Sequence, residues 1–264
     1  MTDCLYFYAG GLMAGTAGTL VSQPFDTCKI HLQTGRKLNI KSRTFFQNIA
    51  WAYKGVTPSI IGYSIEKCLV FGTYTTANKY SSYLWKDNSC FKIPFSGFIA
   101  GLVASLSISP FEQIKTDRQL GNKTMYNYSH LYKGLKYTAM RESIGFSIYF
   151  SAYDQLRKQF SSDKDEFYLN LIKSGFYGAL SAFIAWIPIY PIDLNKTRIQ
   201  SGDQFGNFMQ ELKMQPNKLK FLYRGYHFAM MRAIPFHSTC FVCYELMKYY
   251  SALNTIQYPQ KGEF

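Results

Sequence analysis

One charged pattern recurs three times in this chain of 264 residues. Each copy has a proline, an acid two residues later and a lysine five residues later: Pro24-Asp26-Lys29, Pro110-Glu112-Lys115 and Pro191-Asp193-Lys196. Acid and lysine are three residues apart, so they share one face of a helix. With three copies, each acid can meet the lysine of another copy and close a ring. The attraction between buried partners is nearly offset by the cost of removing them from water, so such a ring is suited to reversible opening.

A second group of charges breaks this threefold pattern. Aligning three later segments on Tyr74, Tyr153 and Tyr244 places unlike residues at equivalent levels, and the charged ones are Glu66, Lys67, Arg141, Glu142 and Arg232. Guanidinium groups hold a carboxylate bidentately, and glutamates attract an ammonium group. With Lys67 turned away toward protein or lipid, the other four charges sum to zero, which favours an amino acid over a dicarboxylate or a nucleotide. The alternative is structural: Arg141 pairs with Glu142, and Lys67 extends its amine toward water.

The elements that position these residues are expected to be membrane helices. Three stretches carry no charge: Leu5–Phe25, Ile93–Phe111 and Ser174–Ile192. Each is close to the roughly 20 residues that span a bilayer. Between them lie three apolar stretches with central ionisable residues, at 56–80, 135–153 and 226–244. Charges inside a membrane usually face a cavity or a partner. The sequence therefore predicts an all-α membrane protein with six transmembrane helices.

Composition and loop charge fit this topology. The net charge is +13, yet only 17% of residues are charged and 18% are aromatic. This balance is unlike that of a soluble nucleic-acid-binding domain, and 47% apolar residues exclude a disordered chain. Segments 27–54, 113–140 and 194–225 hold 17 basic residues against three acidic ones. These loops are expected to face the inner compartment, with both termini on the opposite side.

A second motif follows each copy of the first: Tyr53-Lys54-Gly55, Tyr132-Lys133-Gly134 and Tyr223-Arg224-Gly225. It begins the second helix of each pair, where free backbone N–H groups and a basic residue suit an anionic lipid phosphate. The histidines are scattered, and the only CxxC pair, Cys240 and Cys243, lies within an apolar stretch. We therefore expect no metal site, no cofactor and no enzymatic centre.

The triple Pro-x-acid-x-x-Lys pattern resembles the signature of the mitochondrial carrier family, over roughly residues 5–250. The resemblance implies three pseudo-symmetric repeats, at 1–88, 89–166 and 167–264. Each would hold two tilted membrane helices joined by a short surface helix. It also implies a monomeric, multi-pass protein of the mitochondrial inner membrane that has one central site, works by alternating access and binds cardiolipin. Both termini would face the intermembrane space.

The resemblance assigns roles to individual residues. The matrix gate would consist of the pairs Asp26–Lys115, Glu112–Lys196 and Asp193–Lys29, braced by Gln33, Gln119 and Gln200. The cytoplasmic gate would use Asp154, Arg157, Glu245 and Lys248, but the first repeat has neither charge at the matching positions. Only an Asp154–Lys248 ion pair would remain there, so we expect the outer gate to be the weaker one. The hypothesis that follows is a carrier resting mainly open to the intermembrane space.

The substrate site would comprise Glu66, Arg141, Glu142 and Arg232. The segments around Arg232 and Trp186 are similar to those of ornithine carriers, and the former also to carnitine/acylcarnitine carriers. The sequence thus favours transport of a basic or zwitterionic amino acid such as ornithine, lysine or arginine. Carnitine/acylcarnitine and S-adenosylmethionine are alternatives, and an acidic amino acid becomes plausible if Lys67 binds substrate. The alternatives to a transporter are a membrane enzyme and a non-transporting membrane scaffold. Departures from the family pattern at His31 and Asp117 bear on the substrate, not on the fold.

Overall fold

The computed structural model describes residues 2–34, 44–85, 91–123, 125–160, 167–202 and 205–257. These residues form helices joined by short turns, and none of them is in a strand. Six of the described helices have 26 residues or more. They are α1 (Thr2–Gln33), α3 (Val56–Leu84), α4 (Lys92–Leu120), α6 (Leu135–Phe160), α7 (Phe167–Ser201) and α10 (Tyr226–Gln257). Shorter helices are α2 (Phe45–Ala52), α5 (Tyr128–Leu131), α8 (Phe205–Met214) and α9 (Lys218–Leu222).

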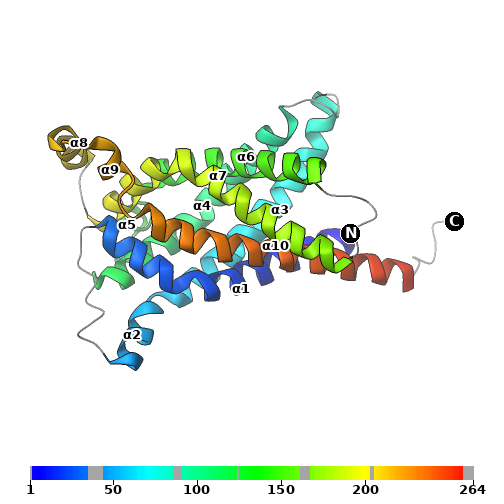
Figure 1. The fold of residues 1–264 in the computed structure, drawn as a ribbon, viewed down its shortest axis with the longest axis horizontal. Helices are drawn as coiled ribbons and strands as arrows, with labels where there is room; N and C mark the ends of the chain where they lie inside the picture. The colour runs from blue at the N-terminus through cyan, green and yellow to red at the C-terminus, as the bar shows by residue number, and fades with distance from the viewer. Residues whose placement is uncertain are drawn as a thin grey trace.

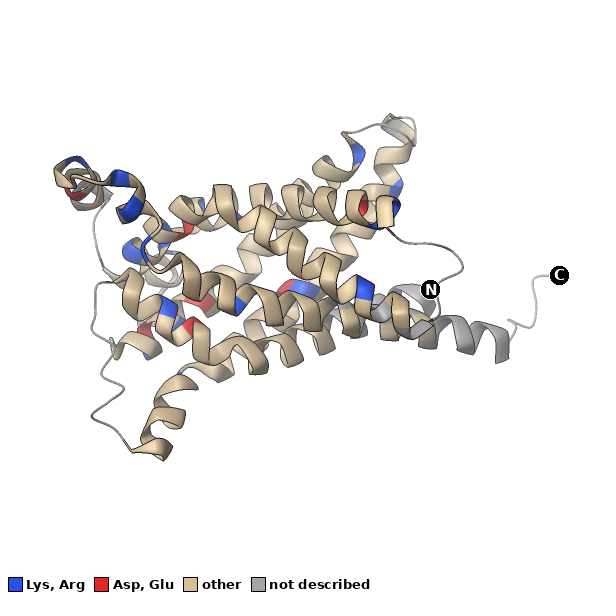
Figure 2. Cartoon of the chain, viewed as in Figure 1, with Lys and Arg blue, Asp and Glu red and all other residues tan. Residues whose placement is uncertain are grey.

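The long helices form a closed ring. Each packs against two others in the order α1, α3, α4, α6, α7, α10 and back to α1. They run along the long axis of the molecule, and the short helices gather at the left end in Figure 1. Lys and Arg residues are frequent at that same end (Figure 2). A ring of helices leaves a central axis, and charged side chains from all six can meet there away from lipid.

Glycines let neighbouring helices approach closely. A Cβ on Gly101 of α4 would lie 2.4 Å from the carbonyl oxygen of Glu142 on α6. On α1, a Cβ on Gly15 would lie 2.5 Å from the Cα of Ser64 on α3. No larger residue fits either position without a backbone shift. Small residues serve this purpose between membrane helices, where the apolar solvent does not drive association.

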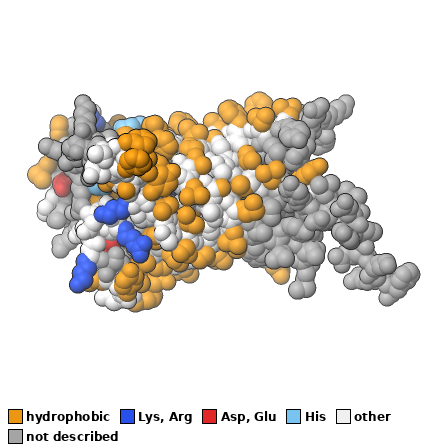
Figure 3. All heavy atoms as spheres, turned by 90° about the horizontal axis from the view of Figure 1, so that it is seen from below, with side chains coloured by type: hydrophobic (Ala, Val, Ile, Leu, Met, Phe, Trp, Pro, Cys, Tyr) orange, Lys and Arg blue, Asp and Glu red, His pale blue; other side chains and the backbone are white. Residues whose placement is uncertain are grey.

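The outer surface of the ring is apolar. Side chains exposed there include Leu102 and Leu106 of α4, and Phe176, Phe183 and Ile187 of α7. Hydrophobic side chains cover much of the middle of the face shown in Figure 3. Within the described residues, α4 and the segment Ile172–Ser201 of α7 are long and apolar enough to cross a membrane. The arrangement with six membrane spans stays a prediction.

Candidate functional site

The three repeated acids and lysines form a ring of ion pairs on the central axis. Lys29 Nζ lies 2.6 Å from Asp193 Oδ2, Lys115 is paired with Asp26, and Lys196 is paired with Glu112. All six side chains are buried. These are the partners expected from the sequence. The pairs join α1 to α4, α4 to α7 and α7 to α1. They therefore connect the first, third and fifth of the long helices near their C-terminal ends.

The three glutamines are buried, but they make unlike contacts. Gln33 Nε2 donates to Asp193 Oδ2 at 3.0 Å and to the Tyr190 hydroxyl at 3.3 Å. Gln119 Nε2 donates instead to the Thr27 hydroxyl at 3.0 Å. Gln200 Nε2 has no hydrogen-bond partner among the described residues. Only Gln33 therefore contacts an ion pair of the ring directly.

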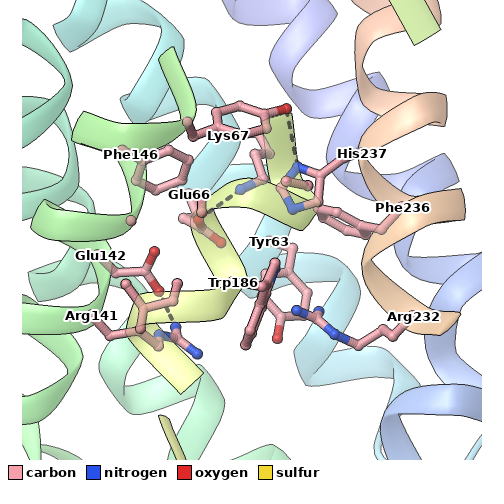
Figure 4. Close-up of a pocket in the computed structure, with 15 residues that line it drawn as sticks. Tyr63, Glu66, Lys67, Arg141, Glu142, Phe146, Trp186, Arg232, Phe236 and His237 are labelled. Carbon is pink, nitrogen blue, oxygen red and sulfur yellow. Dashed lines mark hydrogen bonds and ion pairs between the residues drawn. The ribbon is translucent and has the colours of Figure 1, made fainter. Parts of the chain in front are cut away.

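A cavity lies next to this ring, toward the termini of the chain. Its walls come from α3, α6, α7 and α10, and all four residues predicted to bind substrate line it. Figure 4 shows Glu66, Arg141, Glu142 and Arg232 directed into the same space. The remaining charged or aromatic residues of the lining are Tyr63, Lys67, Phe146, Tyr149, Trp186, Phe236 and His237.

Arg141 is held by three carboxylates. Its Nη1 lies 3.0 Å from Asp193 Oδ1 and its Nη2 lies 2.9 Å from Glu112 Oε1. Nη2 also contacts Glu142, the adjacent residue on α6. The guanidinium fork thus reaches two acids that belong to different ion pairs of the ring.

Arg232 is held much less tightly. Its Nε lies 3.4 Å from Asp26 Oδ1 and has no hydrogen-bond partner among the described residues. The guanidinium lies 5.1 Å from the centre of the Trp186 ring and 5.8 Å from that of Phe236. Aromatic faces stabilise a buried cation, yet they leave its N–H donors unsatisfied. Arg232 is therefore the cation of the site best placed to receive an anionic group.

The expectation that Lys67 turns away from the site is wrong. Lys67 is buried, lines the cavity and donates from Nζ to Glu66 Oε1 at 2.8 Å. Its ammonium lies 4.7 Å from the centre of the Phe146 ring and 5.4 Å from that of Phe236. Adjacent helical residues point about 100° apart, but the long lysine side chain curls back to the carboxylate. The five cavity charges consequently sum to +1 and not to zero.

The aromatic residues of the cavity were missed in the sequence. His237 Nδ1 and the Tyr149 hydroxyl lie 3.1 Å apart, and Tyr63 packs edge-on against Phe236. Aromatic residues occur throughout the chain, so their type does not separate those facing the axis from those facing outward. The helical register of the predicted charges could have indicated Phe236, four residues after Arg232.

The predicted cytoplasmic gate is described only in part. Asp154 Oδ2 pairs with Lys158 Nζ at 2.7 Å, within one turn of α6, and Arg157 is exposed. The side chains of Glu245 and Lys248 lie outside the described residues. In the first repeat, Tyr74 stacks on Phe150 with ring centres 3.9 Å apart. Tyr74 is equivalent to Tyr153 and Tyr244, and the positions that carry charges in the other two repeats are Thr75 and Asn78 in the first.

The Tyr-Lys-Gly motifs precede α3, α6 and α10. Gly55, Gly134 and Gly225 have φ angles of 80°, 81° and 82°, a left-handed conformation that favours glycine. Lys54 and Arg224 beside them are exposed, and Lys133 is half-buried. The backbone geometry explains the glycines of all three copies. Lipid binding by Lys54, Lys133, Arg224 and these glycines stays a prediction.

The two departures from the family pattern make contacts near the ring of ion pairs. Asp117 Oδ2 lies 2.8 Å from His130 Nε2 of α5, and His31 Nε2 lies 3.2 Å from the Gln119 carbonyl oxygen. Both contacts lie outside the cavity. In the part of the chain that the structure describes, no cluster of His, Cys, Asp or Glu is placed to hold a metal ion.

Comparison with known proteins agrees with this architecture. The family model described as mitochondrial carrier protein matches residues 4–83 and 168–253. The mitochondrial carnitine carrier of Saccharomyces cerevisiae is 23% identical, over 91% of this chain and 85% of its own. Mitochondrial ornithine transporter 1 of Rattus norvegicus is 27% identical, covering 89% and 91%. The mitochondrial glycine transporter YMC1 of Saccharomyces cerevisiae is also 27% identical, covering 89% of each chain. The repeated signature, the ring of helices and the family match together show that the chain belongs to the mitochondrial carrier family.

Proposed function

We propose that this carrier moves a zwitterionic amino acid, whose carboxylate binds Arg232 and whose ammonium group is directed toward Glu142 and Glu66. The observation that carries the proposal is the state of Arg232. It is a buried guanidinium on the cavity wall whose Nε lies 3.4 Å from Asp26 Oδ1 but has no hydrogen-bond partner among the described residues. A carboxylate is the group that a guanidinium fork holds best.

The charge of the cavity favours a zwitterion over a basic amino acid. Lys67, Arg141 and Arg232 stand against Glu66 and Glu142, while the neighbouring ring of three acids and three lysines is neutral. Ornithine or arginine would add a further positive charge to a buried site that already carries +1. Uncompensated charge in a low-dielectric site is costly. The relative from yeast named a glycine transporter is compatible with this substrate class.

Basic and acidic amino acids are the second candidates. A relative named an ornithine transporter favours the former, together with the two cavity glutamates. The position of Lys67 favours the latter, because an acidic side chain could bind its ammonium and bring the cavity charge to zero. Carnitine, also a zwitterion, is the cargo in the name of another relative, and the aromatic walls suit its quaternary ammonium.

The rest of the proposal concerns the transport cycle. The ring formed by Asp26, Lys29, Glu112, Lys115, Asp193 and Lys196 is the matrix gate, and the conformation described here has that gate closed. The carrier functions as a monomer of three repeats, with six membrane spans in the mitochondrial inner membrane and both termini in the intermembrane space. The Tyr-Lys-Gly motifs bind cardiolipin. The basic end of the bundle supports this orientation (Figure 2).

Uptake into proteoliposomes containing the purified chain tests the substrate. Labelled glycine, ornithine, glutamate, carnitine and ADP are compared, and a neutral amino acid is expected to enter fastest. Arg232→Lys should raise the KM for it at least about tenfold, a change of 1.4 kcal/mol, because bidentate binding is lost. Arg118→Lys, at an exposed position on α4, is the matched control and should leave KM unchanged. Rapid ADP uptake without amino acid uptake would overturn the proposal.

A further inference from the structure

The two cavity arginines occupy equivalent positions in their repeats but have different surroundings. Arg141 and Arg232 both line the cavity and also a smaller space among the residues of the matrix gate. They therefore lie at the boundary between the site and the gate. The equivalent residue of the first repeat is Gly62, where a Cβ would lie 2.6 Å from the Cβ of Phe111.

We propose that Arg141 is the latch of the matrix gate and not an anchor for the substrate, and that Arg232 alone anchors the substrate carboxylate. The proposal deepens the proposed function, since it divides the arginines of that same site between two tasks. Arg141 is a positioning residue in this sense: it acts on transport through Glu112 and Asp193.

The first support is the way in which Arg141 joins two ion pairs. Each of its acid partners uses one oxygen for Arg141 and the other for a lysine. Glu112 gives Oε1 to Arg141 and Oε2 to Lys196, and Asp193 gives Oδ1 to Arg141 and Oδ2 to Lys29. The fork therefore cross-links α4 and α7 from α6. Without it, Glu112 would keep Lys196, and Asp193 would keep Lys29 and the hydrogen bond from Gln33.

The second support is that both terminal nitrogens of Arg141, Nη1 and Nη2, already donate to carboxylates. In contrast, Nε of Arg232 has no hydrogen-bond partner among the described residues. A substrate carboxylate would have to displace a close partner of Arg141, whereas at Arg232 it would compete with the 3.4 Å contact to Asp26. The substrate carboxylate should therefore bind first at Arg232, where it displaces the weaker contact.

The position of Glu142 shows how the latch is released. Arg141 Nη2 contacts Glu112 on the gate side and Glu142 on the cavity side. Nη2 of Arg141 is thus shared between a carboxylate of the ion-pair ring and a carboxylate of the cavity. A substrate ammonium that binds Glu142 changes this balance, and a substrate carboxylate nearby competes with the gate acids for the same fork. Coupling of site and gate requires such a group whose partners differ between two states.

Labelling of a reporter cysteine below the gate tests the latch without any substrate. Thr197 is buried beside the gate residues, and its hydroxyl bonds only to its own helix. Thr197→Cys is introduced into a chain whose native cysteines are replaced by serine, and the rate of reaction with a charged methanethiosulfonate is measured in the reconstituted protein. Arg141→Gln should react at least about ten times faster than this parent, which corresponds to 1.4 kcal/mol of gate closure. Arg118→Gln, at an exposed position on α4, is the control and should react at the parent rate.

Two further variants keep the test decisive. Arg141→Gln combined with Glu142→Gln leaves no unpaired charge, so it should fold and still react rapidly. Arg141→Lys has one ammonium that reaches a single acid and should be intermediate. In uptake, Arg141→Gln should lower the maximal rate with less than about a threefold change in KM, whereas Arg232→Gln should raise KM more than about tenfold.

Each outcome decides between the alternatives. Parent-like labelling of both Arg141 variants would overturn the latch, and so would rapid labelling of the single variant with slow labelling of the double one. If the parent transports no amino acid, the proposed function fails, while the labelling without substrate still decides the role of Arg141.

Discussion

The unlike contacts of the three glutamines lead to a quantitative prediction. Replacing Gln33 by Leu removes the bond from its Nε2 to Asp193, which is part of the matrix gate. Replacing Gln200 by Leu removes an amide whose Nε2 has no hydrogen-bond partner among the described residues. The two residues are at equivalent places in the repeat and both are buried, with 0% and 4% of their surface exposed. They therefore form a matched pair.

The expected difference can be estimated from these contacts. A hydrogen bond to a charged group contributes about 1.5–3 kcal/mol. Each glutamine also buries one amide atom without a partner, Oε1 in Gln33 and Nε2 in Gln200. The relief from removing that atom is similar in both variants and cancels in the comparison. Gln33→Leu should thus be less stable than Gln200→Leu by about 2 kcal/mol, or about 4–8 °C in the unfolding midpoint of a chain of this size.

Thermal unfolding of the detergent-solubilised protein, followed by the reaction of a thiol-sensitive dye with buried cysteines, measures this difference. Both variants are compared with the unchanged chain at one lipid and detergent composition. Gln33→Leu should also label faster at a cysteine in place of Thr197, because the Lys29–Asp193 pair is weakened. Equal midpoints for the two variants, or a lower midpoint for Gln200→Leu, would refute the assignment of a bracing role to Gln33 alone.

Two other substitutions probe packing and charge in the helix ring. Gly101→Ala places a methyl group against the backbone of Glu142 and should lower the unfolding midpoint strongly. Gly175→Ala should change it little, because the added methyl group meets a Val242 methyl at 3.3 Å and the Ser238 carbonyl oxygen at an ordinary 3.7 Å. Similar midpoints would argue against close α4–α6 packing. Lys67→Gln leaves the buried Glu66 carboxylate without its ammonium partner, so it should be less stable than the double variant with Glu66→Gln by about 3 kcal/mol. A double-mutant cycle measures this coupling. Additive effects of the two substitutions would show that the two side chains do not interact in the folded state.

Much of the ring was predictable because the sequence repeats. Three copies of one pattern at equal offsets predict a ring in which each acid meets the lysine of another copy, and the resemblance to the carrier family implies which lysine that is. The structure contains those three pairs, and it places the long helices around one axis. Symmetry supplied the long-range information that periodicity within one helix does not contain. Where the copies are alike, sequence reasoning therefore reached individual contacts.

Prediction failed where the contact depends on how far a side chain reaches. Register on α3 places Glu66 and Lys67 in different directions, so Lys67 was expected to leave the site, yet its amine lies 2.8 Å from Glu66. Likewise, the sequence placed Arg141 at the level of Arg232 but did not indicate its contacts with the acids of the ring. The reach of Arg141 toward Glu112 and Asp193 depends on the spacing of α4, α6 and α7. A sequence gives the level of a long side chain along a helix but not the partner that it selects.

The matrix-gate ring is threefold in composition but not in strength. Glu112 and Asp193 each have a close lysine and a close arginine, whereas Asp26 has Lys115 and only the 3.4 Å contact with Arg232. The cause is Gly62, since the close approach of Phe111 leaves no room for a third arginine in the first repeat. If a substrate carboxylate binds Arg232, as proposed, it draws that cation away from Asp26, which among the three acids of the ring has the fewest close cationic partners. The proposal therefore predicts that substrate binding first weakens the link between α1 and α4.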